Sequence, residues 1–392
     1  MDQEIYAFDS EETQLEYINK ELFEDLLVWS TDWTIGTIFN LIKKEKIDLS
    51  PKMQRRDVWD ASKKSKLIES ILLNIPIPQI ILAEKSENKG QYLIIDGKQR
   101  LLSITQFLNT LDHNKDNGPS FKDLKLKDLE VLSNLNNLTA KEIFLKEDLS
   151  GYIDIFENQT LRTIIIKNWK DESVLFTVFN RLNTGTEPLS AQELRMTLYP
   201  GPFMDFVNYS ELEELQQILG TTGLDSRMRD VELIIRYYAF KFFLHEYDGK
   251  LRKFFDLTSK QLNKLWETKQ QVIITELENL QNSIKLVFEI FGDNAFKKYL
   301  KNGYSRQFNK VAFDLLTWFL SNKELQEILN DENKKILFRE TYESLFEDRK
   351  VAADFESHTT DYEKVRYRFN KFASLLEEKF SLSFNLNFKE SE

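Results

Sequence analysis

The sequence contains no cysteine and only three histidines, and this excludes several kinds of chemistry. Without cysteine there is no disulfide, no thiolate metal site and no cysteine nucleophile. His113, His245 and His358 lie far apart along the chain, which argues against a histidine-rich metal site. No Ser/His/Asp arrangement, lysine nucleophile, pair of carboxylates in a usable motif or nuclease pattern stands out in the rest of the sequence.

Long apolar runs are missing as well. No stretch reaches the roughly 18 apolar residues that a membrane-spanning helix needs. The first residues, MDQEIYAFDSEETQLEY, are acidic and lack the apolar core of a secretion signal. The sequence therefore predicts a cytoplasmic protein that does not associate with a membrane.

Glycine (12 residues) and proline (7) are scarce in a chain of 392 residues. Few helix breakers, together with many leucine, lysine and glutamate residues, predict a mainly helical chain. The length allows two or three domains.

The net charge of −11 is unevenly distributed. Residues 1–40 carry ten acidic and one basic side chain (−9), and residues 41–100 carry eight acidic and thirteen basic ones (+5), which leaves −7 for the rest. A chain this acidic is a poor non-specific DNA binder. The positive segment can still face a polyanion, and Lys63, Lys64 and Lys66 are its candidates for DNA contact. The alternative is that these lysines form an ordinary solvent-exposed helix face.

The order of patterns predicts an α+β domain over residues 33–200, with a small mixed sheet flanked by helices, after an acidic extension at 1–32. Apolar spacing and turn residues place its helices at 33–47, 62–74 (with Ser62 as N-cap), 100–109, 172–183 and 189–199, and its strands at 79–84, 91–95 and 161–166.

Residues 111–150 are polar and predict an irregular insertion. From residue 201 to 392 the pattern is helical almost throughout, and the tail from about 381 is expected to be partly disordered.

The first candidate site is the segment Asp96-Gly97-Lys98-Gln99-Arg100, where a strand is expected to end and a helix to begin. Free backbone N–H groups and the positive end of the helix dipole favour a phosphate at such a turn. Lys98 and Arg100 add positive charge, and Asp96 is a candidate ligand for Mg²⁺. Alternatively, Asp96 caps the helix and Arg100 forms a surface ion pair.

Two further segments carry suitable side chains. Gln54 and Arg55 lie in an extended stretch, where an arginine can bind an oxyanion and a glutamine can position a water. Asn183 lies at a helix end, and Glu193 and Arg195 lie in the next helix, with Ser190 and Glu193 spaced as a capping box. Because Glu193 and Arg195 are two residues apart, one can serve the cap while the other serves a ligand. The alternative here is an ordinary corner between two helices.

A fourth segment, Arg227–Arg236, is expected to have a mainly structural role. Asp230 is expected to be an N-cap, and Glu232 and Arg236 are spaced as a helix-stabilising pair. Arg229 is a candidate to close the site from the helical region.

Together these segments resemble the family catalogued as domain of unknown function 262, the N-terminal domain of GmrSD-type restriction proteins. The matching stretches occur in the family's order and span about residues 33–245: IDLSPKMQRRDVWD, KLIESILLNIPIPQIIL, YLIIDGKQRLLSI, FNRLNTGTEPLSAQELRMTLYPGPF and RMRDVELIIRYYAF.

The resemblance implies a ParB/sulfiredoxin-like fold that binds and hydrolyses a nucleoside triphosphate (NTP). It assigns the family's Asp-Gly-x-Gln-Arg motif to Asp96, Gly97, Gln99 and Arg100. Its other motif positions fall on Gln54, Arg55, Asn183, Glu193 and Arg195. In the mechanism that it implies, arginines contact phosphate, Gln54 or Gln99 positions the attacking water, and any Mg²⁺ lies near Asp96.

The family commonly acts in defence against phage, where NTP turnover licenses cutting of foreign or modified DNA. This chain departs from the pattern at Lys98, where glutamine is common, and in residues 246–392. That region has a single histidine, His358, and does not resemble the family's nuclease domain. A separate nuclease is therefore an expected partner, and the helical region is otherwise a sensor or an oligomerisation surface. Three alternatives remain open: a nucleotide switch without turnover, a DNA-binding specificity subunit, and a helical scaffold with an inactive site, which the intact Asp-Gly-x-Gln-Arg motif argues against.

Overall fold

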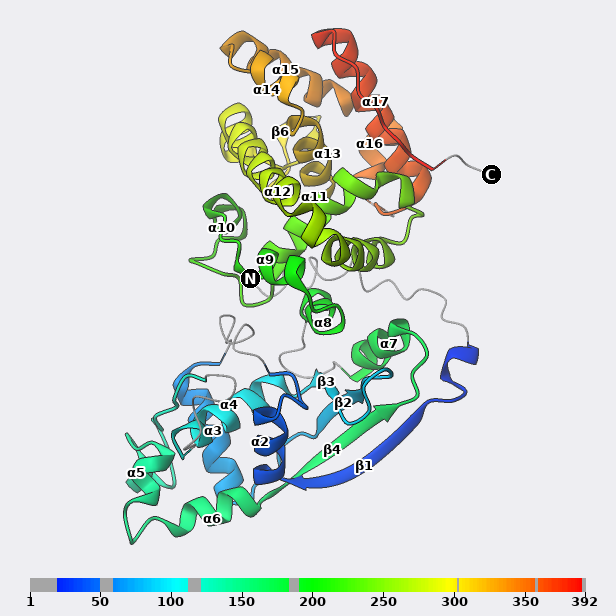
Figure 1. Cartoon of the computed structure of the whole chain (residues 1–392). Helices are drawn as coiled ribbons and strands as arrows, with labels where there is room; N and C mark the ends of the chain where they lie inside the picture. The colour runs from blue at the N-terminus through cyan, green and yellow to red at the C-terminus, as the bar shows by residue number, and fades with distance from the viewer. Residues whose placement is uncertain are drawn as a thin grey trace. The chain divides into compact units, whose positions relative to one another are not determined.

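The computed structural model describes residues 20–49, 59–111, 121–182, 190–301, 303–356 and 359–389. The contacts divide the chain into two units, with the boundary between Leu198 and Tyr199. The first unit combines a four-stranded sheet with helices and the second is almost entirely helical (Figure 1), which confirms the predicted α+β class. Among the described residues, no helix combines the length and the apolar character needed to cross a membrane.

The elements of the first unit are η1 (Lys20–Phe23), β1 (Leu27–Thr34), α2 (Ile35–Lys43), α3 (Ala61–Leu72), β2 (Ile80–Glu84), β3 (Tyr92–Asp96), α4 (Lys98–Leu108), η3 (Asn109–Leu111), η5 (Ser133–Leu135), α5 (Ala140–Phe144), α6 (Gly151–Asn158), β4 (Thr160–Lys167), α7 (Glu172–Leu182) and α8 (Ala191–Leu198).

The sheet has the strand order β1-β4-β2-β3. β2 runs parallel to β4, with Ile81 opposite Ile164, while β1–β4 and β2–β3 are antiparallel. Successive residues of β2 alternate between two apolar clusters: Ile80 and Leu82 pack toward α2, α3, α4 and α6, whereas Ile81 and Ala83 pack toward α7 and α8. Figure 1 shows α2, α3 and α4 together on one side of the sheet and α7 on the other. The central strands are thus buried on both faces, which explains their continuous apolar runs.

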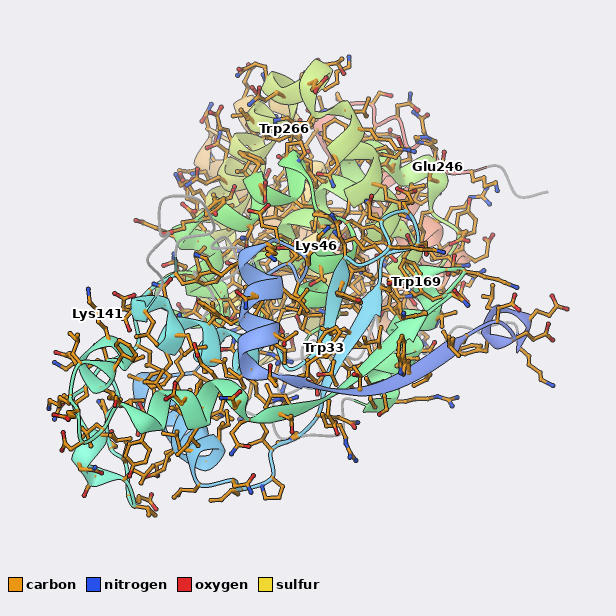
Figure 2. All side chains as sticks on the ribbon, turned by 60° about the horizontal axis from the view of Figure 1, so that its bottom comes forward. Trp33, Lys46, Lys141, Trp169, Glu246 and Trp266 are labelled. Carbon is orange, nitrogen blue, oxygen red and sulfur yellow. The ribbon has the colours of Figure 1, made fainter. Side chains whose placement is uncertain are left out.

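Strand β1 was not predicted, and the helix expected from residue 33 begins only at Ile35. β1 is an edge strand, and Leu27, Val28 and Trp29 are each more than half exposed. It therefore lacks the alternation of a half-buried strand, and its β-branched and aromatic residues are the only sign of a strand in its sequence. Figure 2 shows Trp33 where β1 runs into α2, and its ring packs edge-on against Tyr92 of β3 with centroids 5.6 Å apart.

The predicted cap of α3 is wrong by two residues. The N-cap is Asp60, whose Oδ1 accepts the Lys63 amide at 2.8 Å, rather than Ser62. A carboxylate at the N-cap also interacts favourably with the helix dipole.

Residues 121–150, expected to be irregular, form the short helical turn η5 and the helix α5 around buried apolar side chains. Phe121, Leu126 and Leu135 belong to the same core cluster as α3 and α4. The Glu69 carboxylate of α3 accepts the backbone amides of Glu130, Val131 and Leu132 at 2.8–3.2 Å. The described part of this segment is therefore packed into the domain.

The second unit contains α9 (Pro202–Tyr209), α10 (Glu213–Leu219), α11 (Arg229–Phe243), η6 (Leu244–Glu246), α12 (Leu251–Phe291), η7 (Gly292–Asn294), β5 (Tyr299–Leu300), β6 (Gly303–Tyr304), α13 (Lys310–Leu320), α14 (Lys323–Ile328), α15 (Glu332–Leu345), α16 (Arg349–Asp354) and α17 (Tyr362–Phe380).

Helix α11 is the central element of this unit, since every residue from Asp230 to Phe240 is buried. Its N-cap is Met228 in the left-handed region, and not Asp230 as predicted. The predicted pair of Glu232 and Arg236 is loose, with Nη1 of Arg236 4.0 Å from Oε1 of Glu232. Arg236 instead donates two hydrogen bonds to the carboxylate of Asp314 in α13, at 2.5 and 2.8 Å.

The tail after α17, expected to be partly disordered, is extended in its described part. Phe384 packs on Phe319 with ring centroids 4.9 Å apart, and Phe388 packs on Phe369.

Candidate functional site

The candidate site is built where β3 ends and α4 begins. The apolar residues of β3 are buried in the sheet, and the chain turns at Gly97, which has a φ of 95° and is the N-cap of α4. The helix starts with the bond from the Leu101 amide to the Gly97 carbonyl at 2.9 Å. Gly97 supplies no side-chain cap, so the first-turn amides of α4 are not satisfied in that way.

Two features require a glycine at position 97. A positive φ of this size strains any residue with a Cβ. A Cβ there would also lie 2.6 Å from Cδ1 of Ile80 and 3.3 Å from Nη2 of Arg100. The neighbouring strand β2 and the Arg100 side chain therefore approach the turn as closely as the backbone allows.

Asp96 and Arg100 hold each other across this turn. Nη2 of Arg100 donates to Oδ2 of Asp96 at 2.8 Å and to the Gln79 carbonyl at 3.0 Å. Oδ1 of Asp96 accepts the Gly97 amide at 2.7 Å, so Asp96 supports the turn and is not the N-cap of α4. The Arg100 side chain is only 14% exposed, and its Nε has no hydrogen-bond partner among the described residues. The guanidinium is thus fixed in orientation while retaining a free donor.

Gln99 occupies the position next to this arginine. Both polar atoms of its side-chain amide are buried, and neither finds a partner in the part of the chain that the structure describes. A buried polar group without a hydrogen bond costs on the order of 1–3 kcal/mol. A free amide at a helix start therefore indicates a position prepared for a ligand or a water.

Helix α8 confirms one expectation about local structure. The Ser190 amide donates to Oε2 of Glu193 at 2.7 Å, and the Glu193 amide donates to Oγ of Ser190 at 3.1 Å, which completes the predicted capping box. Leu194 belongs to the same core cluster as Leu93 and Ile95, so α8 packs on the strand that leads to Asp96.

Arg195 is completely buried, and its Nη1 donates to Oε1 of Gln192 at 2.6 Å. Nε2 of Gln192 has no partner among the described residues. Sequence reasoning did not single out Gln192, although its place three residues before Arg195 on one helix was a usable signal.

The three lysines proposed for DNA contact all lie on α3 and have different surroundings. Lys64 is buried and its Nζ donates to Oε1 of Gln106 at 2.9 Å. Lys66 pairs with Glu130 at 2.6 Å, and this hydrogen bond raises the lysine's pKa. Lys63 lies over the ring of Trp59, 4.9 Å from its centroid.

The remaining predicted residues are placed as follows. Lys98 is the first residue of α4 and is buried. Gln54, Arg55 and Asn183 lie outside the described residues. Within the described ranges, no group of three or more His, Asp or Glu side chains is arranged to hold a metal ion.

Residues 35–200 match the family described as the N-terminal domain of GmrSD restriction endonuclease. Neither the curated proteins nor the solved structures contain a match to the chain. The match covers β2, the Gly97 turn and α8, and ends near the boundary between the two units. The first unit of this chain therefore carries a GmrSD-type N-terminal domain, from a family of restriction-type proteins.

Proposed function

We propose that the first unit binds an NTP with its phosphates at the turn Gly97–Arg100 and hydrolyses it, within a defence system that senses foreign or modified DNA. The observation that carries the proposal is the buried, unpartnered amide of Gln99 beside the fixed guanidinium of Arg100. Polar groups left unsatisfied in a native structure commonly mark a ligand position.

The groups at the turn suit phosphoryl transfer. The first-turn amides of α4 and the helix dipole favour a phosphate, and Arg100 can stabilise the charge that develops on it. The Gln99 amide can orient the attacking water, because it offers both a donor and an acceptor. Gln54, Arg55, Asn183 and Arg195 complete the set of side chains that we propose to test.

Each oxygen of Asp96 accepts one bond, from the Gly97 amide and from Arg100, so the carboxylate is fixed and still has lone pairs for a metal ion. Mg²⁺ usually binds proteins through one or two carboxylates together with substrate phosphates. We therefore propose that any Mg²⁺ arrives with the triphosphate and that Asp96 mainly positions Arg100.

The test is nucleotide binding and phosphate release with ATP, GTP, CTP and UTP in the presence of Mg²⁺. We expect Arg100→Ala to lower phosphate release at least about 100-fold, which is the range for removing a charge-stabilising donor. Arg162→Ala is the matched control, because Arg162 is exposed and pairs only loosely with Asp32 at 3.6 Å.

The same assay decides between the alternatives. Binding without phosphate release would support a nucleotide switch. If the pure protein binds none of the four nucleotides at millimolar concentration, the proposal fails. DNA cutting is expected to require a separate nuclease, so the chain alone should leave DNA intact.

A further inference from the structure

The second unit contains a cavity of about 660 Å³ that is formed within this unit alone. The C-terminal ends of α10 and α12, the first residue of α11 and the segment leading into α13 line it. Its size lies within the range of small-molecule sites.

The lining of this cavity is mainly positive, although the chain as a whole carries a net charge of −11. Four lining residues are basic (Arg229, Lys297, Arg306 and Lys310) and one is acidic (Asp293), which gives a formal charge of +3. The first residues of α11 and α13 are Arg229 and Lys310, so the positive ends of two helix dipoles meet the same space.

Two of these cations are fixed in the wall. Arg229 binds Asp225 through Nε and Nη2 at 2.8–3.2 Å, and Lys310 donates to Glu232 at 2.7 Å. These carboxylates offset their charge, so Arg229 and Lys310 define the shape of the wall more than its net charge.

The other two cations are available to a ligand. Lys297 donates to the backbone carbonyl of Asp293 at 2.6 Å and has no carboxylate partner among the described residues. Arg306 is exposed, and no described residue forms an ion pair with it. An arginine and a lysine without carboxylate partners can bind a phosphate group.

Aromatic and amide side chains complete the lining. Phe288 and Phe308 are only partly buried, so part of each phenyl ring is accessible at the cavity, and Gln217 and Gln307 bring side-chain amides. Aromatic faces stack on bases, and amides can pair with base edges. The exposed carboxylate of Asp293 can accept hydrogen bonds from the hydroxyl groups of a ribose, as acidic residues do in dinucleotide sites.

We infer that this cavity is a second nucleotide site, which binds a nucleotide through its base and a terminal phosphate. The inference is independent of the proposed NTP site, because none of its residues belongs to the first unit. A free nucleotide and the 5′-phosphorylated end of a nucleic-acid strand offer the same chemistry.

The test measures binding of three probes to the full chain by calorimetry: AMP, a hexathymidylate with a 5′-phosphate, and the same oligonucleotide without it. All measurements are made in the Gly97→Ala background, in which the proposed NTP site is expected not to bind nucleotide and so does not contribute. We expect micromolar to sub-millimolar binding of a phosphorylated probe, weakened at least tenfold by Arg306→Glu. Lys323→Glu, an exposed charge reversal at the start of α14, is the control and should leave binding unchanged.

The probes distinguish the two sources. Tighter binding of AMP indicates a free nucleotide, and tighter binding of the phosphorylated oligonucleotide indicates a strand end. The inference is overturned if no probe binds at millimolar concentration or if the Arg306→Glu variant binds the probes as tightly as the protein with Arg306. It is also overturned if the two oligonucleotides, with and without the 5′-phosphate, bind equally. Failure here leaves the proposed NTP site untouched, since that site is tested by the Arg100→Ala change in phosphate release.

Discussion

The contact between α11 and α13 in the second unit and the Gly97 turn in the first unit treat buried polar groups differently. In the second unit, Arg236 and Asp314 are almost fully buried and meet in a two-pronged ion pair, with Lys310 and Glu232 forming a buried pair nearby. At the Gly97 turn of the first unit, Arg100 keeps a free Nε, and the Gln99 amide has no partner among the described residues.

This difference separates buried polar groups that stabilise the fold from buried polar groups that are available for function. A buried ion pair between two helices holds them in register. Removing one side chain of the pair leaves the charge of the other buried without compensation. A buried amide without a partner lowers stability, so its presence in a fold calls for another explanation, such as a role in function. The comparison therefore predicts which substitutions will affect folding and which will affect function.

The largest effect is expected from Asp314→Ala. It leaves Arg236 buried without its main partner, so the free energy of unfolding should fall by about 3–5 kcal/mol. Urea unfolding followed by tryptophan fluorescence measures this change. The double variant Arg236→Met with Asp314→Leu should be much less destabilised, and a loss below about 1 kcal/mol for Asp314→Ala alone would contradict the structural role.

A smaller effect is expected from Glu69→Gln. This variant tests whether a fully hydrogen-bonded buried charge also stabilises the first unit. Burial opposes ionisation of Glu69, but three backbone amides donate to its carboxylate, and its pKa is lowered from the ordinary value of 4.5. Glutamine should reduce stability by about 2 kcal/mol at pH 7.

The pH dependence of this effect follows from the sign of the shift. Because the pKa is lower in the folded state, the stabilisation by Glu69 is fully present above about pH 4.5 and is lost as the pH falls through the folded value. Unfolding curves of the two proteins should therefore converge in acid. A constant difference down to pH 3 would show that charge is not involved.

Gly97→Ala should destabilise the first unit by about 1–2 kcal/mol and abolish nucleotide binding. The added Cβ meets Ile80, and the positive φ is strained. Gly90→Ala is a matched control, since Gly90 has a φ of +80° but no atom within 4 Å of an added Cβ. If the two variants behave alike in melting temperature and in binding, the close approach at the turn has no role.

The smallest effect on stability is expected from Gln99→Met, which removes two unsatisfied polar atoms at nearly constant volume. Stability should be unchanged or rise by up to about 1 kcal/mol, while phosphate release is lost. Gln106→Met on the same helix is the contrasting variant, because it removes the buried hydrogen bond between Lys64 and Gln106 and should be destabilising. A stability loss in Gln99→Met above 1 kcal/mol would indicate a structural role for this amide.

Much of the first unit was predictable because its signals are local. The apolar runs of β2, β3 and β4 and the spacing of Ser190 and Glu193 determine structure over a few residues, and the structure follows them. β1 escaped prediction because an edge strand exposed on both faces has no period-two apolar pattern.

The site was predictable only in part. The Asp96–Arg100 turn could be located, since a strand, a glycine and a helix follow one another in sequence. The partners of its side chains could not, because Gln79, Ile80 and α8 reach the turn or its strand through tertiary packing. The surroundings of the α3 lysines could not be predicted either, because Nζ of Lys64 donates to Gln106, 42 residues away in the sequence.

Helix α12 carries a consequence for how the second unit can deform. It is 41 residues long, about 60 Å, and packs on α9, α11, α13 and α15. Helix α11 contacts it both near its start, at Phe254, and further along, at Ile273 and Glu276. Asn263 and Trp266 still contact α9, but from residue 267 to residue 272, a stretch that the structure describes completely, every side chain of α12 is exposed. Backbone hydrogen bonds and helix-forming residues hold these six residues, and such spans open locally more easily than packed ones. Bending strain on α12 will therefore be absorbed there, with both packed ends left intact.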